Sequence, residues 1–280
     1  MINRCYLEIT NICNLSCDFC HKTNRSPMMM KMEDFLVILN KLKGNIKYLY
    51  FHLMGEPLLH ENISDFISIS KNFGFIPILT TNGTKISNSY AKLIESCPYK
   101  INISLHSLDS SNYSNINNYL DSIINFTKEI IKKGTIVNLR LWNLGYNNSR
   151  NSYIISYIID SFKSDINKIS SGYKISDKVY IDLDDKFDWP DLNHKSYQEK
   201  SFCHALRDQI GILVDGTVVP CCLDADGILN LGNIYKNDFN DIITSSKAKL
   251  IYDGFTNHTP KEELCKRCGY INETKKYHKK

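Results

Sequence analysis

Residues 1–183 alternate between short apolar segments and amphipathic segments, and this alternation limits the possible folds more than any other feature of the sequence. Six segments have the length and the Ile, Leu, Val and Tyr content of strands: 4–10, 46–54, 75–81, 100–107, 135–142 and 178–184. Apolar residues at helical spacing lie between them, as at Met32, Phe35, Leu36, Leu39 and Leu42. Strands that alternate with helices form a parallel sheet with right-handed crossovers.

Six strand–helix repeats are too few for the closed eight-stranded barrel. The sequence therefore predicts an α/β fold in which residues 1–190 form a partial (β/α)6 barrel, with its active face at the C-terminal ends of the strands. Neighbouring residues of a strand point to opposite faces, so the alternation predicts polar side chains inside the barrel. These are Glu8, His52, Ser104, His106, Arg140 and Asp182. Such an interior is typical of a binding cavity.

The pattern changes after Pro190. Residues 210–222 predict a hairpin that turns at Asp215 and Gly216, and a helical stretch follows at 239–251. Residues 191–280 are too few for a large core of their own, and cysteines lie toward both ends of this segment. We therefore predict a small C-terminal domain over residues 191–280 that a metal centre stabilises.

Composition indicates a cytoplasmic protein with reduced cysteines. No apolar run approaches the roughly 20 residues needed to span a bilayer, and the N-terminus lacks the regions of a signal peptide. The net charge is only +4, and apart from a basic tail at 275–280 the Lys and Arg residues are spread along the chain. We therefore expect no nucleic-acid partner. In a reducing compartment, clustered cysteines indicate metal sites rather than disulfides.

The first cysteine group follows the first expected strand directly and consists of Cys13, Cys17 and Cys20. Thiolates are the usual ligands of iron–sulfur clusters. Because a cubane cluster contains four irons, three cysteines would leave one iron free to bind another molecule. The alternative is a zinc site completed by His21, which adjoins Cys20.

The loop CNLSCDFC and three later stretches resemble the signature of the radical S-adenosylmethionine (SAM) enzymes. LMGEP at 53–57 is similar to the Gly-Gly-Glu-Pro motif of that family, TTNG at 80–83 ends the third strand, and ISLHS at 103–107 ends the fourth. The resemblance implies that SAM and a [4Fe-4S] cluster are cofactors and that a 5′-deoxyadenosyl radical is formed. It also implies a set of residues that bind SAM, with Phe19 against adenine and Arg140 on the carboxylate: Phe19, Gly55, Glu56, Pro57, Asn82, Ser104 and Arg140.

A second cysteine group lies in the predicted C-terminal domain: Cys203, Cys221, Cys265 and Cys268. Its surroundings resemble the SPASM extension of the radical SAM enzymes and its short form, the twitch domain. The resemblance implies an auxiliary [4Fe-4S] cluster held by all four thiolates, with Cys221 rather than its neighbour Cys222 as a ligand. A structural zinc is the alternative. We expect Cys5 in a strand and Cys97 on the core-facing side of a helix, and neither at a metal.

An auxiliary cluster without an open iron can accept an electron from a substrate radical, which favours oxidation over isomerisation. The expected function is therefore that of a radical SAM oxidoreductase that dehydrogenates a small-molecule alcohol or a sugar-like substrate. The expected reductant is a flavodoxin or a ferredoxin. The chain begins at its first strand, without a separate peptide-recognition domain. For this reason a peptide-modifying enzyme that forms a cross-link, an epimer or a mature sulfatase is the alternative. A zinc-stapled binding module without catalysis is the alternative from another class. Four inward residues could take up the substrate proton: His52, His106, Glu8 and Asp182.

Overall fold

The computed structural model describes residues 2–110, 115–146, 148–163, 166–195 and 198–270, and the basic tail at 275–280 lies outside these ranges. The described strands form one sheet in the order β11-β10-β9-β1-β2-β3-β4-β5-β8-β7-β6. Its central strands pair in parallel: β1 (Arg4–Leu7), β2 (Tyr48–Phe51), β3 (Ile76–Thr81), β4 (Lys100–Ser104), β5 (Ile136–Leu144) and β8 (Val179–Asp185). Each matches an expected strand, so the parallel α/β fold is confirmed.

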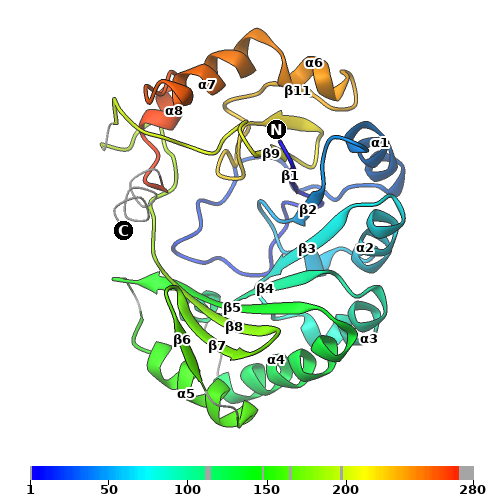
Figure 1. Ribbon diagram of the computed structural model, residues 1–280, viewed down its shortest axis with the longest axis vertical. Coiled ribbons are helices and arrows are strands. Elements are labelled where there is room, and N and C mark those ends of the chain that lie inside the picture. The colour runs from blue at the N-terminus through cyan, green and yellow to red at the C-terminus, as the bar shows by residue number, and fades with distance from the viewer. Residues whose placement is uncertain (1, 111–114, 147, 164–165, 196–197, 271–280) are drawn as a thin grey trace.

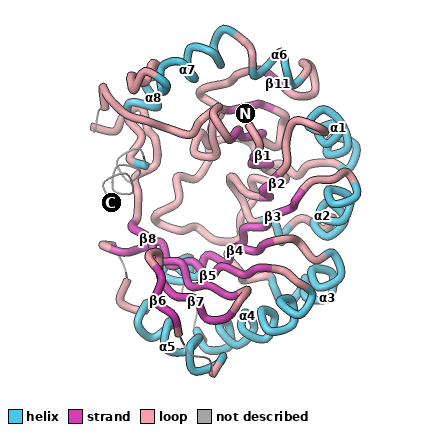
Figure 2. Tube along the Cα trace, viewed as in Figure 1, coloured by secondary structure: helices cyan, strands magenta, loops and turns pink. Residues whose placement is uncertain are grey.

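Helices cover the outer side of the curved sheet (Figure 1). They are α1 (Met32–Leu42), α2 (Ile63–Asn72), α3 (Ile86–Ser96), α4 (Ile116–Ile130) and α5 (Asn151–Phe162). The ring of Phe35 on α1 stacks on Phe66 of α2 with centroids 4.1 Å apart, and it lies 6.2 Å from the ring of Phe51 on β2. Burial of each such side chain stabilises the fold by about 1.5–3 kcal/mol. The long loop between β1 and α1, which carries the first cysteine group, runs along the inner side of the sheet (Figure 2).

Two strands extend the barrel beyond the expected repeats. β6 (Asn167–Ile169) and β7 (Gly172–Ser176) form an antiparallel hairpin that pairs with β8 at one edge of the sheet. Gly172 has a φ of +142°, and a Cβ atom there would lie 2.1 Å from the carbonyl oxygen of Ile181. Only glycine allows the hairpin to approach β8 this closely.

The C-terminal segment continues the same sheet at its other edge. β9 (Gln209–Ile212) pairs in parallel with β1, and β10 (Thr217–Val219) and β11 (Gly232–Asn233) follow in antiparallel pairs. The expected hairpin at 210–222 is therefore confirmed. The hydrophobic core also continues from the barrel into this segment through Ile210, Ile212 and Phe255. One hydrophobic core thus contains residues from both sides of the boundary expected at residue 190.

The helical stretch expected at 239–251 consists of two helices. They are α6 (Phe239–Ile243) and α7 (Ser246–Thr256). The second helix begins at Ser246 because Ser245 caps it: the Ser245 hydroxyl oxygen accepts a hydrogen bond from the backbone N–H of Ala248 at 3.2 Å. A last short helix, α8 (Glu263–Lys266), carries Cys265. Among the described residues, no helix has the length and apolar character needed to cross a membrane.

Two details of the sequence prediction are wrong. β2 ends at Phe51 rather than at residue 54, because the chain turns there and the following residues pack into a second small core with Leu213, Val219 and Ala225. Cys97 is not on the core-facing side of a helix but is the C-cap of α3, with a φ of +46° and its Sγ 3.4 Å from the hydroxyl oxygen of Thr135. Cys5 is buried in β1, as expected.

Candidate active site

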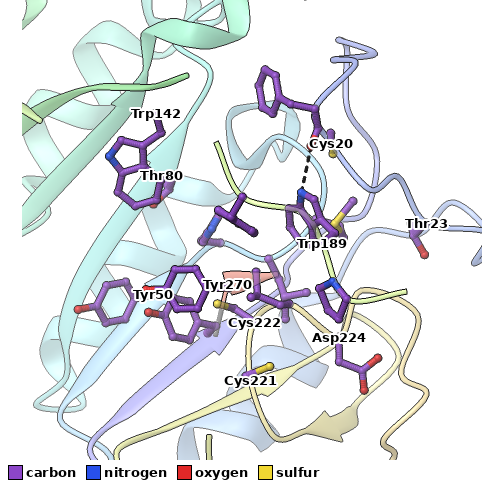
Figure 3. Close-up of a pocket in the computed structure, with 18 of the residues that line it drawn as sticks. Cys20, Thr23, Tyr50, Thr80, Trp142, Trp189, Cys221, Cys222, Asp224 and Tyr270 are labelled. Carbon is purple, nitrogen blue, oxygen red and sulfur yellow. Dashed lines mark hydrogen bonds between the residues drawn. The ribbon is translucent and has the colours of Figure 1, made fainter. Parts of the chain in front are cut away.

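A cavity of 510 Å³ is lined by inward-facing residues of the barrel strands and by both cysteine groups. The cysteines that line it are Cys13, Cys17, Cys20, Cys203, Cys221, Cys222, Cys265 and Cys268. The strand residues on its wall include Tyr6, Tyr50, Thr80, Ser104 and Arg140. Figure 3 shows Tyr50, Thr80, Trp142 and Tyr270 around this space together with Cys20, Cys221 and Cys222. One cavity therefore connects two groups that lie almost 200 residues apart in the sequence.

Asn82, from the TTNG stretch, holds the first cysteine loop against the end of β3. Its side-chain amide donates to the carbonyl oxygen of the Asn14 side chain at 3.1 Å and lies 3.9 Å from the Sγ of Cys13. Its own side-chain oxygen accepts from the backbone N–H and the hydroxyl of Thr84 at 2.9 and 2.7 Å. Since Asn82 is buried and fully engaged, it positions the loop that carries the thiols.

Glu56 joins the ends of β2 and β3. One carboxylate oxygen accepts from the Thr81 hydroxyl at 2.7 Å and from the backbone N–H of Leu58 at 2.9 Å, and the other accepts from the backbone N–H of Asn82 at 2.7 Å. Burial raises the pKa of Glu56 above its usual value, and these three hydrogen bonds offset only part of that rise. Most of the carboxylate's accepting capacity is thus used inside the protein. Pro57 follows at the start of the short 3₁₀ helix η1 (Pro57–Leu59) and is buried.

Gly55 sits where the loop after β2 meets the segment after β1. Its φ is +76°, and a Cβ atom there would lie 2.3 Å from the carbonyl oxygen of Thr10 and 2.9 Å from that of Ile12. The backbone N–H of Glu56 donates to this same Ile12 oxygen at 2.8 Å. Glycine is required because both neighbours are backbone atoms that cannot rotate away.

Phe19 and His106 form another part of the wall. Their ring centroids are 4.9 Å apart. The Nδ1 atom of His106 lies 3.1 Å from the carbonyl oxygen of Arg140 and 3.3 Å from the backbone nitrogen of Trp142. Which of these contacts is a hydrogen bond depends on the tautomer of the imidazole. In both cases β5 fixes the ring that supports Phe19. Ser104 ends β4 and also lines the cavity.

The four candidate bases have different surroundings. His52 and His106 line the cavity, whereas Glu8 and Asp182 are not among the described residues that line it. Burial first, and then the charge of Arg140, lowers the pKa of His52 to about 4. Burial also lowers the pKa of His106 to about 4. Both imidazoles are therefore neutral at pH 7 and able to accept a proton.

Glu8 is a buried structural carboxylate. It pairs with the guanidinium of Arg25 at 2.7 Å and accepts hydrogen bonds from the backbone N–H groups of Met54 at 3.3 Å and Val214 at 3.0 Å. It thereby connects β1 with the cysteine loop, the loop after β2 and the C-terminal hairpin. Asp182 on β8 accepts a hydrogen bond from the indole N–H of Trp142 at 3.2 Å.

The second cysteine group gathers at the other side of the cavity. Burial raises the pKa of Cys221 well above its usual value, and the charges of Cys222, Cys203, Cys265 and Cys268 raise it further. The five thiols are therefore close neighbours. The side chains of Cys221 and Cys222 point in different directions, and Cys222 lies beside Tyr270 (Figure 3). Cys221 also packs against the main core, whereas Cys222 packs against the small second core.

Residues 186–190 contact the surroundings of both cysteine groups. The indole N–H of Trp189 donates to the carbonyl oxygen of Phe19 at 3.0 Å, which Figure 3 marks with a dashed line. The ring of Phe187 lies 5.7 Å from Trp189 and 5.2 Å from Tyr270. The sequence placed Phe187 and Trp189 in a loop, 185–195, that we expect to contribute to substrate specificity, but it did not predict these contacts, because the partners lie far away in the chain.

Asp226 ties the cysteine loop to the C-terminal segment. It accepts from the Thr23 hydroxyl at 2.7 Å and from the backbone N–H of Asn24 at 3.1 Å, and it lies 3.3 Å from the Nε2 of His21. The ring of His21 also lies 6.0 Å from Trp189 in a stacked arrangement. His21 therefore has a carboxylate partner in the C-terminal segment.

The donor sets fit iron–sulfur clusters. Burial, and then the charges of Cys20 and Cys13, raise the pKa of Cys17 to about 11, so the three thiols of the loop are neighbours. Among the described residues, no three His, Cys, Asp or Glu side chains lie close enough to share a single metal ion. Zinc needs such closeness, with Zn–S bonds of about 2.3 Å. A cubane spreads its thiolates over several irons, so thiols that are close but separated suit it better.

Two family models match the chain. One describes the radical SAM superfamily and matches residues 7–148. The other is SPASM, an iron–sulfur cluster-binding domain, which matches residues 203–269. Each match contains one of the two cysteine groups described above.

Curated proteins and solved structures with similar sequences or folds agree with these matches. The probable GTP 3',8-cyclase of Sulfurisphaera tokodaii is 27% identical over an alignment of 288 residues that covers 89% of each protein. BtrN in complex with AdoMet and 2-DOIA aligns with a TM-score of 0.61 at 17% identity, over 96% of this chain and 93% of that one. Streptococcus suis SuiB bound to the precursor peptide SuiA aligns with a TM-score of 0.62 at 16% identity, over 97% and 70%. At these identities the structures show the fold alone.

Proposed function

The chain belongs to the radical SAM superfamily and carries a SPASM iron–sulfur cluster-binding domain, and from this premise we propose that it is an oxidoreductase that dehydrogenates a small-molecule alcohol or a sugar-like substrate. The observation that carries the proposal is the cavity that both cysteine groups line. A substrate in this cavity lies between the two groups and contacts both sides. The cavity volume of 510 Å³ is within the usual range for small-molecule sites.

The cysteines divide into two ligand sets in this proposal. Cys13, Cys17 and Cys20 hold the SAM-binding [4Fe-4S] cluster, and the auxiliary [4Fe-4S] cluster is held by Cys203, Cys221, Cys265 and Cys268. When bound, SAM and the clusters supply a 5′-deoxyadenosyl radical that abstracts a substrate hydrogen and an acceptor for the substrate's electron. A flavodoxin or a ferredoxin is the proposed reductant.

The residues around the first cysteine group form the proposed SAM site. Phe19 supplies a ring for adenine, Ser104 a hydroxyl for the ribose or the carboxylate, and Gly55 a close backbone approach. Glu56 and Asn82 act mainly by fixing the loops, because their side chains are engaged with the protein. Pro57 fixes the start of η1. Ser104 ends β4, and the other residues lie in the segments that follow β1, β2 and β3, on the side of the sheet where α/β folds bind ligands.

His52 is the proposed base that takes the substrate proton. It lines the cavity, and its imidazole is neutral at pH 7, although burial and then the charge of Arg140 lower its pKa to about 4 and so weaken it as a base. His106 is less suitable because β5 holds its Nδ1, and its ring packs on Phe19. The contacts of Glu8 and Asp182 favour a structural role for these two carboxylates.

Two other reactions are worth testing. The relative from Sulfurisphaera tokodaii is named a probable GTP 3',8-cyclase, so a redox-neutral ring closure on a nucleotide is the second candidate. SuiB was solved with a peptide, so peptide modification is the third. Oxidation leaves a product two electrons more oxidised than the substrate, whereas ring closure does not change the oxidation level. The change in mass from substrate to product therefore separates oxidation from ring closure, and the substrate that is consumed separates peptide modification from both.

The first test is the iron and sulfide content after anaerobic reconstitution. We expect about eight irons per chain in the wild type and about four in a variant with Cys13, Cys17 and Cys20 replaced by Ala. The wild type should cleave SAM to 5′-deoxyadenosine with a chemical reductant, and the variant should not. An iron content of about four in the wild type, lost in the variant, would refute the second cluster and with it the oxidation mechanism.

A further inference from the structure

Arg140 lines the cavity and forms no ion pair with any described residue. Its guanidinium carbon lies 4.2 Å from the ring centroid of Trp142, and its Nε is buried with no hydrogen-bond partner. Among the described residues, no carboxylate oxygen lies within 4.0 Å of its guanidinium nitrogens. Burial lowers the pKa of Arg140, yet arginine stays protonated in proteins. A buried cation of this kind is costly unless an anion compensates it.

The nearest acidic group along the sheet is Asp182, whose charge raises the pKa of Arg140 but which forms no ion pair with it. Asp182 is the register partner of Arg140 on the neighbouring strand β8. One of its oxygens accepts a hydrogen bond from the indole N–H of Trp142 at 3.2 Å. Trp142 thus covers the guanidinium with its ring and holds the carboxylate with its N–H. This geometry leaves the cavity side of Arg140 for a ligand.

No acidic side chain among the described residues of the cavity wall pairs with Arg140. The basic side chains that line the cavity are Arg4, Lys22, Arg140 and Lys186. The acidic ones among the described residues are Glu56 and Asp224. Asp224 accepts hydrogen bonds from the backbone N–H groups of Ile228 at 2.9 Å and Leu229 at 2.7 Å, and Glu56 accepts three within the protein. Neither carboxylate is therefore an ion-pair partner of Arg140.

Arg140 faces the inner side chains of β1 and β2 and the second cysteine group. Its charge acts on the side chains of Tyr6, Tyr50, His52 and Cys222. The charges that act on Cys13 and Cys17 come instead from Glu56, Asp18 and the thiols of the loop itself. The charge of Arg140 also acts on His106, so the guanidinium lies within reach of both sides of the cavity.

We propose that Arg140 binds an anionic group of the substrate, a carboxylate or a phosphate, with the ring of Trp142 behind it. The guanidinium offers two parallel N–H donors to such a group. This inference rests on the proposed function only in that it calls the ligand a substrate, since binding of an anion can be measured without turnover. It differs from the role that the family resemblance assigns to Arg140, the carboxylate of SAM.

The test is calorimetric titration of the reconstituted protein with phenyl phosphate, in saturating SAM. Under saturating SAM, the carboxylate of SAM already occupies the protein groups that bind it. We expect the wild type to bind phenyl phosphate, and Arg140→Gln to weaken that binding at least tenfold while the dissociation constant of SAM changes less than twofold. Arg140→Lys, which keeps the charge but not the paired donors, should give an intermediate affinity.

Arg207→Gln is the matched control. The guanidinium of Arg207 also lies over an aromatic ring, 4.8 Å from the centroid of Tyr252, and its Nε also lacks a partner, but it does not line the cavity. It should leave phenyl phosphate binding unchanged. Weak SAM binding in Arg140→Gln, phenyl phosphate binding that survives this change, or no binding to the wild type would each overturn the proposal. The iron content and SAM cleavage of the wild type test the proposed function separately.

Discussion

Replacement of Gly55 by Ala tests whether the loop after β2 is held against the cysteine loop by backbone contact. Gly55 has a φ of +76°, and Gly44 is the matched control, because it has a φ of +82° but nothing within 4 Å of an added Cβ. A left-handed residue other than glycine costs about 1–2 kcal/mol at both positions. At Gly55 the Cβ would also lie 2.3 Å from the Thr10 carbonyl oxygen. Overpacking of this kind adds about 1–3 kcal/mol.

The assay is thermal unfolding at one scan rate, followed by SAM binding to the reconstituted variants. A change of 1 kcal/mol shifts the midpoint by about 2–4 °C in a protein near this size. We therefore expect Gly55→Ala to unfold about 2–12 °C below Gly44→Ala, and to bind SAM at least tenfold more weakly. Equal midpoints and equal SAM affinities for the two variants would refute the reasoning. The cost of a left-handed backbone, which both positions share, would then account for the whole loss of stability.

Three further predictions concern the same cavity. Glu56→Gln should lower the free energy of unfolding by about 2–4 kcal/mol, because an amide nitrogen would face a backbone N–H, whereas the exposed Glu61→Gln should have no effect in the same denaturation experiment. Cys221→Ala should lose about four irons on reconstitution, whereas Cys222→Ala should keep them; the reverse result would exchange their roles. The imidazole of His52, identified by NMR through His52→Gln, should not titrate between pH 5.5 and 8, because burial and Arg140 lower its pKa to about 4 and keep it neutral there; a midpoint near 6.5 would contradict this.

The sequence predicted the parts of the fold that depend on local periodicity. The six parallel strands and the helices between them follow from apolar spacing, and the hairpin at 210–222 follows from its Asp-Gly turn. The β6–β7 hairpin was missed because its strands have only three and five residues and mixed composition. The end of β2 was placed too late because Leu53 and Met54 are apolar for another reason, the small core that they form with the C-terminal segment.

The candidate site divides in the same way. Cysteine spacing and the resemblance to the radical SAM signature made the cysteines, Gly55, Glu56 and Asn82 candidates, and the structure brings all of them to one cavity or its rim. Alternation along strands could say that Glu8 and Asp182 point inward, but not that each already has a partner. Such partners come from distant segments, Arg25 in a loop and Trp142 on another strand. Pairings of this kind depend on tertiary structure and leave no local pattern.

The C-terminal segment is joined to the cysteine loop by polar contacts as well as by the shared sheet. Arg25 pairs with Glu8 and donates to the carbonyl oxygen of Ala225 at 2.9 Å, and Asp226 accepts from Thr23 and Asn24. Glu8 in turn accepts from the backbone N–H of Val214. Each contact links one cysteine group's surroundings to the other's. Because a hydrogen bond to a charged group contributes about 1.5–3 kcal/mol, these contacts together can fix the distance between the groups. A substrate that must contact both therefore meets a cavity whose two sides are held in register before it binds.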